Sequence, residues 1–254
     1  MTAATPVSKQ TSVYVYGVTW VDGAGHRHGA GVSGADVELL EHGELAAVVS
    51  MVPNGPVRAR RRDLLRHMDV LQDAFASSTV LPLPFGSTFA DTDAVVDGLL
   101  GERYEELVAL LQRFEGLGEL RVRAVYREDE VLADIVRSDA RIARLRDATR
   151  GAPPRDPRLL QLGEAVAKAL AAQRERDLAE LSSSLRRLAL DAVVEPPHAD
   201  LELMRASFLV ERQRIPDFDA LMNDLARNRR ERVGFTYTGP LPPHSFVAVS
   251  QGRR

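Results

Sequence analysis

The sequence predicts an α+β fold: a ferredoxin-like N-terminal domain, then a second α+β domain with a long helical hairpin and an extended C-terminal tail. Strand-like and helical segments are grouped rather than strictly alternating, which is typical of the α+β class. After Arg127 the composition shifts to alanine, leucine, arginine and glutamate. The expected parts are a disordered lead-in at 1–12, the ferredoxin-like domain at 13–127, the hairpin-containing domain at 128–238 and the proline-rich tail at 239–254.

The N-terminal strands are predicted from β-branched and aromatic content. Val13–Trp20 is apolar almost throughout, which indicates an interior strand covered on both faces. Asp36–Glu41 and Glu44–Val52 form an expected hairpin around His42-Gly43. The intervening loop, 21–34, contains five glycines and is expected to be mobile.

Helical spacing follows from Val57 to Ser77. The apolar stripe of this predicted helix consists of Leu64, Leu65, Met68, Leu71 and Phe75. Thr79–Leu83 is predicted to be a short edge or terminating strand because it contains a proline. Asp91–Asp93 is expected to cap a second helix that runs to about Glu115, and Leu120–Tyr126 is expected to close the first domain as a strand. The predicted sheet carries both helices on one face.

The second half begins with two long helical patterns. Asp129–Arg150 predicts one helix, Gly151–Pro154 breaks it, and Arg158–Leu190 predicts a longer one. Leucines in the longer helix recur at the 3–4 spacing of a coiled-coil seam, which Arg174 interrupts once. The two helices are therefore expected to form a helical hairpin.

The last elements are again mixed. Leu201–Glu211 and Val233–Thr238 predict strands, and Pro216–Arg227 predicts a helix with proline at its first position. Three prolines in Gly239–Val249 exclude regular helix, so this tail is expected to lie extended against another part of the chain.

Composition is that of an ordinary globular protein, with 44% hydrophobic and 27% charged residues. A net charge of -3 gives no reason to expect nucleic acid or an anionic membrane as a partner. The chain lacks cysteine, which excludes disulfides and thiolate chemistry, and it has no apolar run of 18 residues. A cytoplasmic location is expected.

A cluster of five arginines is the sharpest charge feature. It consists of Arg58, Arg60, Arg61, Arg62 and Arg66. Cations at a helix N-terminus oppose the helix dipole, so we expect a later helix start, acidic neighbours or an anionic ligand. A solvated face paired with Asp63 and Asp69 is favoured over a site for an anion or an acidic partner.

Other polar residues give no catalytic, cofactor or metal site. His26 and His28 fall short of a four-ligand zinc set and are read as part of a solvated loop. His67 is read as a histidine at the boundary of a packed helix. His244 and Ser245 are adjacent in an extended tail, so their side chains are expected to point apart. The glycines of the first loop do not form a nucleotide-binding motif, and the protein is not expected to be an enzyme.

Two proline–aromatic segments suit packing or recognition: TVLPLPFGSTFAD at Thr79–Asp91 and TGPLPPHSF at Thr238–Phe246. Their structural or partner-contact candidates are Leu81, Pro82, Phe85, Gly86, Phe89, Gly239, Pro240, Pro242, Pro243 and Phe246. A structural role is favoured over direct partner contact.

These segments carry a resemblance to the gas vesicle accessory protein family F/L (GvpL/GvpF). VLPLPFGSTFAD resembles the family pattern VLP(L)RFGTvF, and TGPLPPHSF resembles TGPWPPYSF. VYVYGVTW, ELAAVVSMVP, RHMDVLQDAF and ASFLVERQRIPDFDALMNDL extend the resemblance over about 13–249. Pro84 stands where the family often has arginine, Leu241 where it has tryptophan and His244 where it has tyrosine.

The resemblance implies an accessory or minor structural protein of gas vesicles that binds the small hydrophobic shell protein GvpA during nucleation or growth. Other gas vesicle accessory proteins are further implied partners, and the implied location is the gas vesicle or the cytoplasm. The alternative from another class is a ferredoxin-like regulatory module that binds an anion or small ligand through the arginine cluster.

Overall fold

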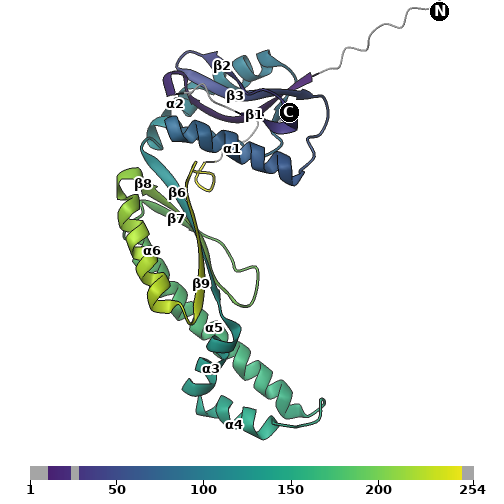
Figure 1. Cartoon of the computed structure of the whole chain (residues 1–254), viewed down its shortest axis with the longest axis vertical. Helices are drawn as coiled ribbons and strands as arrows, with labels where there is room; N and C mark the ends of the chain where they lie inside the picture. The colour runs from purple at the N-terminus through teal and green to yellow at the C-terminus, as the bar shows by residue number, and fades with distance from the viewer. Residues whose placement is uncertain (1–10, 24–28, 248–254) are drawn as a thin grey trace, which may run out of the picture. The chain divides into compact units, whose positions relative to one another are not determined.

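The computed structural model describes residues 11–23 and 29–247 (Figure 1). Helices and antiparallel strands confirm the α+β class. The chain divides into two compact units: the first unit contains the described parts of 1–119 and 240–254, and the second unit is Leu120–Gly239. The more specific ferredoxin-like assignment stays a prediction.

The first sheet contains the N-terminal strands in the order β2-β3-β1-β4, with β5 also paired to β1. Its strands are β1 (Thr11–Trp20), β2 (Glu38–His42), β3 (Leu45–Pro53), β4 (Val80–Pro82) and β5 (Thr88–Phe89). β1 lies between β3 and β4, and its residues 12–19 are all buried, which confirms the interior strand. The β2–β3 hairpin is also confirmed. Gly43 in its turn has a φ of 59°, a conformation that favours glycine.

The helices of the first unit are α1 (Arg61–Ser77), the π-helical segment Ala94–Gly101 and α2 (Tyr104–Arg113). Short 3-10 turns lie at Val21–Gly23 and Val32–Gly34. The second predicted helix is therefore two segments, and the carboxylate of Asp91 accepts a hydrogen bond from the N–H of Ala94 at its start. α1 buries Asp63, His67, Val70, Leu71, Ala74 and Phe75, whereas Leu64 and Leu65 are exposed. The predicted stripe of α1 is therefore confirmed at Leu71 and Phe75 and wrong at Leu64 and Leu65, where polar residues occupy the buried face instead.

Helices cover both faces of the first sheet. Tyr14 and Tyr16 belong to the core that α1 covers, while Val13 and Val15, which point the other way, are equally buried. The π-helical segment contacts β2 and β3, and α2 contacts β1 and β4. Figure 1 draws these segments on the side of the sheet opposite α1. The expectation of both helices on one face was wrong.

The second sheet has the order β7-β8-β6-β9. Its strands are β6 (Leu117–Tyr126), β7 (Asp191–Val194), β8 (Glu202–Glu211) and β9 (Val233–Leu241). The predicted strand at Leu120–Tyr126 therefore does not close the first sheet. Leu120, Val122 and Ala124 belong to a single core with residues of β8 and α5, so this strand is held by partners later in the chain. β7 was not expected from the sequence.

The helices of the second unit are α3 (Glu128–Ser138), α4 (Ala140–Thr149), α5 (Pro157–Arg186) and α6 (Ile215–Arg229), and a 3-10 turn at Arg212–Arg214 precedes α6. One helix was expected over Asp129–Arg150, but Asp139 divides it. Asp139 has extended backbone, and its carboxylate accepts hydrogen bonds from the N–H groups of Arg141 and Ile142. An N-cap inside the helical pattern thus ends one helix and begins the next. α4 and α5 lie side by side around the Gly151 turn, as predicted for the hairpin.

Candidate functional site

The segment Thr79–Asp91 packs into the first sheet. Leu81 pairs with Val18 and Pro82 with Gly17, and both Leu81 and Pro82 are buried in edge strand β4. Phe89 pairs with Val13 in β5 and is half-buried. The five candidate residues of this segment therefore come from one edge of the sheet and the turn that follows it.

Gly17 is required by the close approach of β4. A Cβ atom added at Gly17 would lie 2.7 Å from the carbonyl oxygen of Leu81, a backbone atom that cannot rotate away. Gly17→Ala is expected to lower the free energy of unfolding by about 1–3 kcal/mol through overpacking. Urea denaturation measures the change. Gly98→Ala is the control, because nothing lies within 4 Å of the added Cβ, and it should cost less than about 0.5 kcal/mol.

Phe85 and Gly86 join an aromatic cluster between β1 and α1. The Phe85 ring lies 6.0 Å from Tyr14 and 5.6 Å from His67, and Tyr16 stacks on His67 at 5.6 Å. The N–H of Gly86 donates a hydrogen bond to the Tyr14 hydroxyl at 3.1 Å. Burial raises the pKa of Tyr14, so its hydroxyl stays protonated. Through these ring contacts and this hydrogen bond, the cluster holds the VLPLPFG segment against the sheet and α1.

His67 is a core residue and not a boundary residue, which corrects the sequence-based expectation. Its side chain is 3% exposed, and Nδ1 lies 2.9 Å from the Tyr14 hydroxyl. Burial, together with nearby His244, lowers the pKa of His67 to about 4, although a hydrogen bond to the backbone of Leu83 acts in the opposite direction. His67 is therefore uncharged at neutral pH.

The second proline–aromatic segment also has a structural position. Gly239 and Pro240 continue strand β9, and Pro242 and Pro243 are buried. The side-chain amide of Gln72 in α1 donates a hydrogen bond to the carbonyl of Pro240 at 3.1 Å. The segment is thus held against the first unit, as expected, but it is only partly extended.

Beyond Pro243 the tail forms a turn. The N–H of Phe246, a half-buried residue, donates to the carbonyl of Pro243 at 3.1 Å. The N–H and hydroxyl of Ser245 donate to the carboxylate of Glu119, at 2.7 and 2.8 Å, and Glu119 is fully buried. These bonds tie the tail to the start of β6 within the first unit.

The arginine cluster lies at and before the start of α1. Arg58 and Arg60 precede the helix, which begins later than the spacing suggested, and they are exposed together with Arg61 and Arg62. Arg66 donates a hydrogen bond to the carbonyl of Ala30. Arg62 lies 3.9 Å from Asp63, a carboxylate that also accepts from the N–H of Ser33. The structure does not bring the five arginines together around one point.

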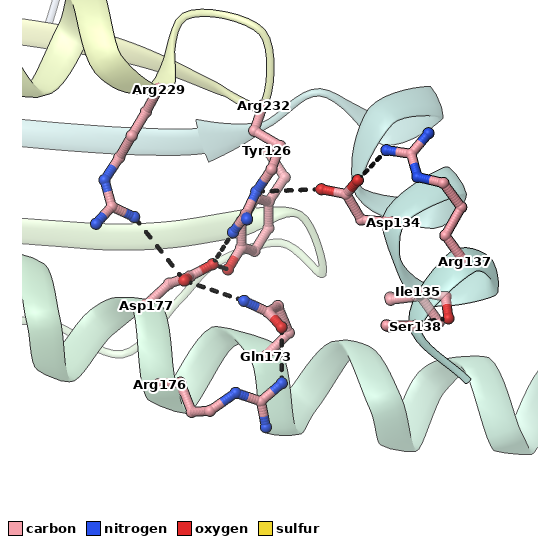
Figure 2. Close-up of polar contacts among 10 residues, drawn as sticks. All are labelled: Tyr126, Asp134, Ile135, Arg137, Ser138, Gln173, Arg176, Asp177, Arg229 and Arg232. Atoms are coloured by element: carbon pink, nitrogen blue, oxygen red, sulfur yellow. Dashed lines mark hydrogen bonds and ion pairs between the residues drawn. The ribbon is translucent and has the colours of Figure 1, made fainter. Parts of the chain in front are cut away.

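A buried carboxylate in the second unit was missed by the sequence reasoning. Asp177 of α5 accepts hydrogen bonds from the Tyr126 hydroxyl at 2.5 Å, from the Gln173 amide at 3.0 Å and from Arg232, and Arg229 lies 3.8 Å away (Figure 2). Burial alone would raise the pKa of Asp177, but these hydrogen bonds and the Arg232 charge outweigh it, so the pKa lies below its usual range. The carboxylate is therefore ionised.

The Asp177 cluster joins four elements. Tyr126 ends β6, Gln173 and Asp177 come from α5, and Arg229 and Arg232 flank the turn from α6 into β9. Arg232 also pairs with Asp134 of α3 at 3.5 Å. One signal could have indicated the cluster: Asp177 is four residues before Leu181 and eight before Leu185, both fully buried, so it occupies a core position of the α5 seam.

The chemistry of these residues is that of packing and internal ion pairing. Within the described ranges, no group of three or more histidine, aspartate or glutamate side chains is placed to hold a metal ion. His26 and His28 lie outside the described residues. Of the helices that the structure describes, none is both long and apolar enough to cross a bilayer. The structure is therefore that of a two-unit α+β protein. Its two proline–aromatic segments pack against the fold, and its polar clusters stabilise the architecture.

The chain belongs to the GvpL/GvpF family of gas vesicle proteins. The family model described as "Gas vesicle synthesis protein GvpL/GvpF" matches residues 12–248, which confirms the resemblance. Gas vesicle protein F of Streptomyces sp. (strain CB03234) is 35% identical over 93% of this chain and 99% of its own length. Gas vesicle protein L of the same strain is 29% identical over 94% and 93%.

A solved structure has the same fold. The crystal structure of GvpF from Anabaena sp. PCC7120 superposes with a TM-score of 0.80 at 21% identity, covering 94% of this chain and 99% of that one. Family membership gives this chain the role of an accessory gas vesicle protein associated with gas vesicles.

Proposed function

We propose that this protein acts in gas vesicle assembly by binding the small hydrophobic shell protein GvpA during nucleation or growth of the vesicle wall. Membership in the gas vesicle family supports the setting. The observation that carries the binding proposal is the helical hairpin of α4 and α5, whose apolar side chains remain only partly covered.

Burial along α5 changes abruptly at Asp177. No residue from Pro157 to Arg176 is buried, although Leu162, Val166 and Leu170 repeat at helical spacing. Beyond Asp177, Leu181 and Leu185 are fully buried against the sheet. The apolar side chains in the first two-thirds of α5 thus pack against the core only in part and leave apolar surface in contact with water.

Such a surface suits the docking of an amphipathic helix. Helix-in-groove recognition uses apolar side chains three or four residues apart, as α5 presents them. A small, very hydrophobic shell subunit gains by covering its own apolar face before it is incorporated in the wall. The hairpin would then hold the subunit without a deep pocket. The cytoplasm is the compartment in which we place this step.

Leu162 is the test position, because it belongs to the apolar stripe with Val166 and Leu170 and its side chain is only half-buried at the start of α5. Leu162→Asp is expected to weaken binding of GvpA about tenfold or more, which corresponds to the burial of one leucine side chain, and far-UV circular dichroism checks that the fold is kept. The measurement is a split-reporter or pull-down assay between the full-length protein and GvpA. The same variant should lower vesicle yield when it replaces the wild-type gene in a deletion strain.

Leu190→Asp is the matched control. Leu190 is 59% exposed in the same unit but lies outside the hairpin, so its replacement should leave GvpA binding unchanged. Equal loss of binding in both variants, or no loss in either, would contradict the assignment of the hairpin. Absence of binding by the wild-type protein, together with normal vesicles in the deletion strain, would contradict the whole proposal.

The alternative of an anion-binding module has lost support. The groove beside the arginine cluster is lined by Arg61, Arg62 and Arg66 but also by Asp69 and Asp73. The two carboxylates offset most of the attraction that the arginines would exert on an anion.

A further inference from the structure

The outer face of α1 carries a row of side chains at intervals of four residues: Arg61, Leu65, Asp69 and Asp73. Leu65 is 53% exposed, the largest value among the large apolar side chains in the described part of the first unit. All four residues line one groove of about 800 Å³ between α1 and residues 29–30. The row is apolar in its centre, basic towards the helix N-terminus and acidic towards the C-terminus.

This order of charges opposes the helix dipole, which favours acids at the N-terminus and bases at the C-terminus. Within residues 11–23 and 29–247, Arg61, Asp69 and Asp73 form no ion pair. Within the part of the chain that the structure describes, no ion pair therefore compensates this order of charges. A second surface with the reverse order of charges would form ion pairs with this row.

The same helix supplies that reverse order when it is turned end over end. We propose that α1 pairs with α1 of a second copy of this chain, antiparallel, about a two-fold axis at Leu65. Arg61 lies four residues before Leu65 and Asp69 four residues after it, so each is about 6 Å from the axis along the helix. The axis brings Arg61 opposite Asp69 of the partner subunit, and Asp69 opposite the partner's Arg61.

Further contacts follow from the same axis. Leu65 meets the partner's Leu65 at the centre, where water is displaced from two exposed side chains. One turn further out, Asp73 faces the start of the partner's α1, where Arg58 and Arg60 are exposed. Because one helix pair covers less than the ~1,200–2,000 Å² of a stable interface, the dimer is weak and depends on ionic strength.

This surface lies on α1, whereas the shell-protein proposal concerns α4 and α5, so either proposal can fail alone. The experiment uses the full chain and two charge reversals, Arg61→Asp and Asp69→Arg. Sedimentation equilibrium over a concentration series in about 50 mM salt, below physiological ionic strength, measures the dimerisation constant. Far-UV circular dichroism checks that each exposed substitution leaves the fold intact.

Each single variant should lower the association constant of the dimer about tenfold, because the two attractive Arg61–Asp69 pairs become two repulsive pairs. An equimolar mixture of the two variants should recover the wild-type constant, since a mixed dimer again pairs opposite charges at both positions. The double variant should recover it too. Arg155→Asp reverses an exposed arginine elsewhere and should change nothing.

Three results would overturn the proposal. The wild-type protein could sediment as a monomer at every concentration. Both single variants could dimerise as the wild type does, which would place self-association on another surface. The mixture could associate no better than either single variant alone. In that case α1 does not pair with α1 of a second copy, and an acidic segment of a different protein becomes the occupant of this face.

Discussion

Asp177→Asn should lower the free energy of unfolding by about 3 kcal/mol, at the low end of the cost of breaking a buried ion pair. Asparagine keeps the shape of the side chain but removes the charge that Arg232 and Arg229 face. The Tyr126 hydroxyl retains an acceptor, so the loss reflects the charge. We expect the low end of that cost because the Arg232 side chain remains 34% exposed and water can reach it. Urea denaturation followed by circular dichroism measures the change.

Asp224→Asn is the control for this prediction. Asp224 also pairs with an arginine, Arg227, but both side chains are mostly exposed, so the substitution should cost less than about 0.5 kcal/mol. Similar losses from Asp177→Asn and Asp224→Asn would show that the buried cluster contributes nothing special. A second check is pH: because the pKa of Asp177 is lowered in the folded state, its contribution is present above the unfolded pKa and is lost as pH falls through the folded pKa.

Stability should also fall by about 3 kcal/mol between pH 6.5 and pH 4 because of His67 alone. Its pKa is about 4 in the folded protein, against 6.5 for an ordinary histidine. The unfolded chain therefore binds a proton in this range that the folded chain does not, and acid favours unfolding. The contribution is complete above pH 6.5 and is lost as pH approaches 4. Urea denaturation at a series of pH values measures the slope of the unfolding free energy against pH.

Replacement of His67 by glutamine removes the titrating group, so the slope between pH 6.5 and 4 should become shallower than in the wild type. His198→Gln is the matched control, because it makes the same substitution at a histidine that is exposed. The groups that face His67 are Tyr14, Tyr16 and Phe85 with nearby His244, and none of them is a carboxylate. An unchanged slope in His67→Gln would mean that His67 is solvated in the folded protein.

Local patterns predicted most of the regular structure. The run of β-branched and aromatic residues at Val13–Trp20 placed an interior strand, and the proline in Thr79–Leu83 placed a strand at an edge. The proline at the start of α6 and the break at Gly151 lie where the sequence put them. These features depend on backbone chemistry within a few residues, and such chemistry is visible in the sequence.

Phase and pairing were less predictable. The predicted stripe of α1 began with Leu64 and Leu65 and continued through Met68 to Leu71 and Phe75. Leu71 and Phe75 are buried, but Asp63 and His67 are buried in place of Leu64 and Leu65. Both polar residues are satisfied by groups distant in sequence, His67 by Tyr14 and Asp63 by Ser33. A hydrophobicity pattern assumes that polar residues face water, and it fails where a remote partner supplies the hydrogen bond.

The sequence by itself determined the α+β class, most helix and strand positions, and the family through two proline–aromatic segments. Only the tertiary structure decided that β6 belongs to the second sheet, that His67 and Asp177 are buried, and that the apolar residues of α5 divide into covered and uncovered parts. The physical reason is the same in each case. Backbone preferences act over a few residues, whereas strand pairing and burial depend on which distant residues come into contact.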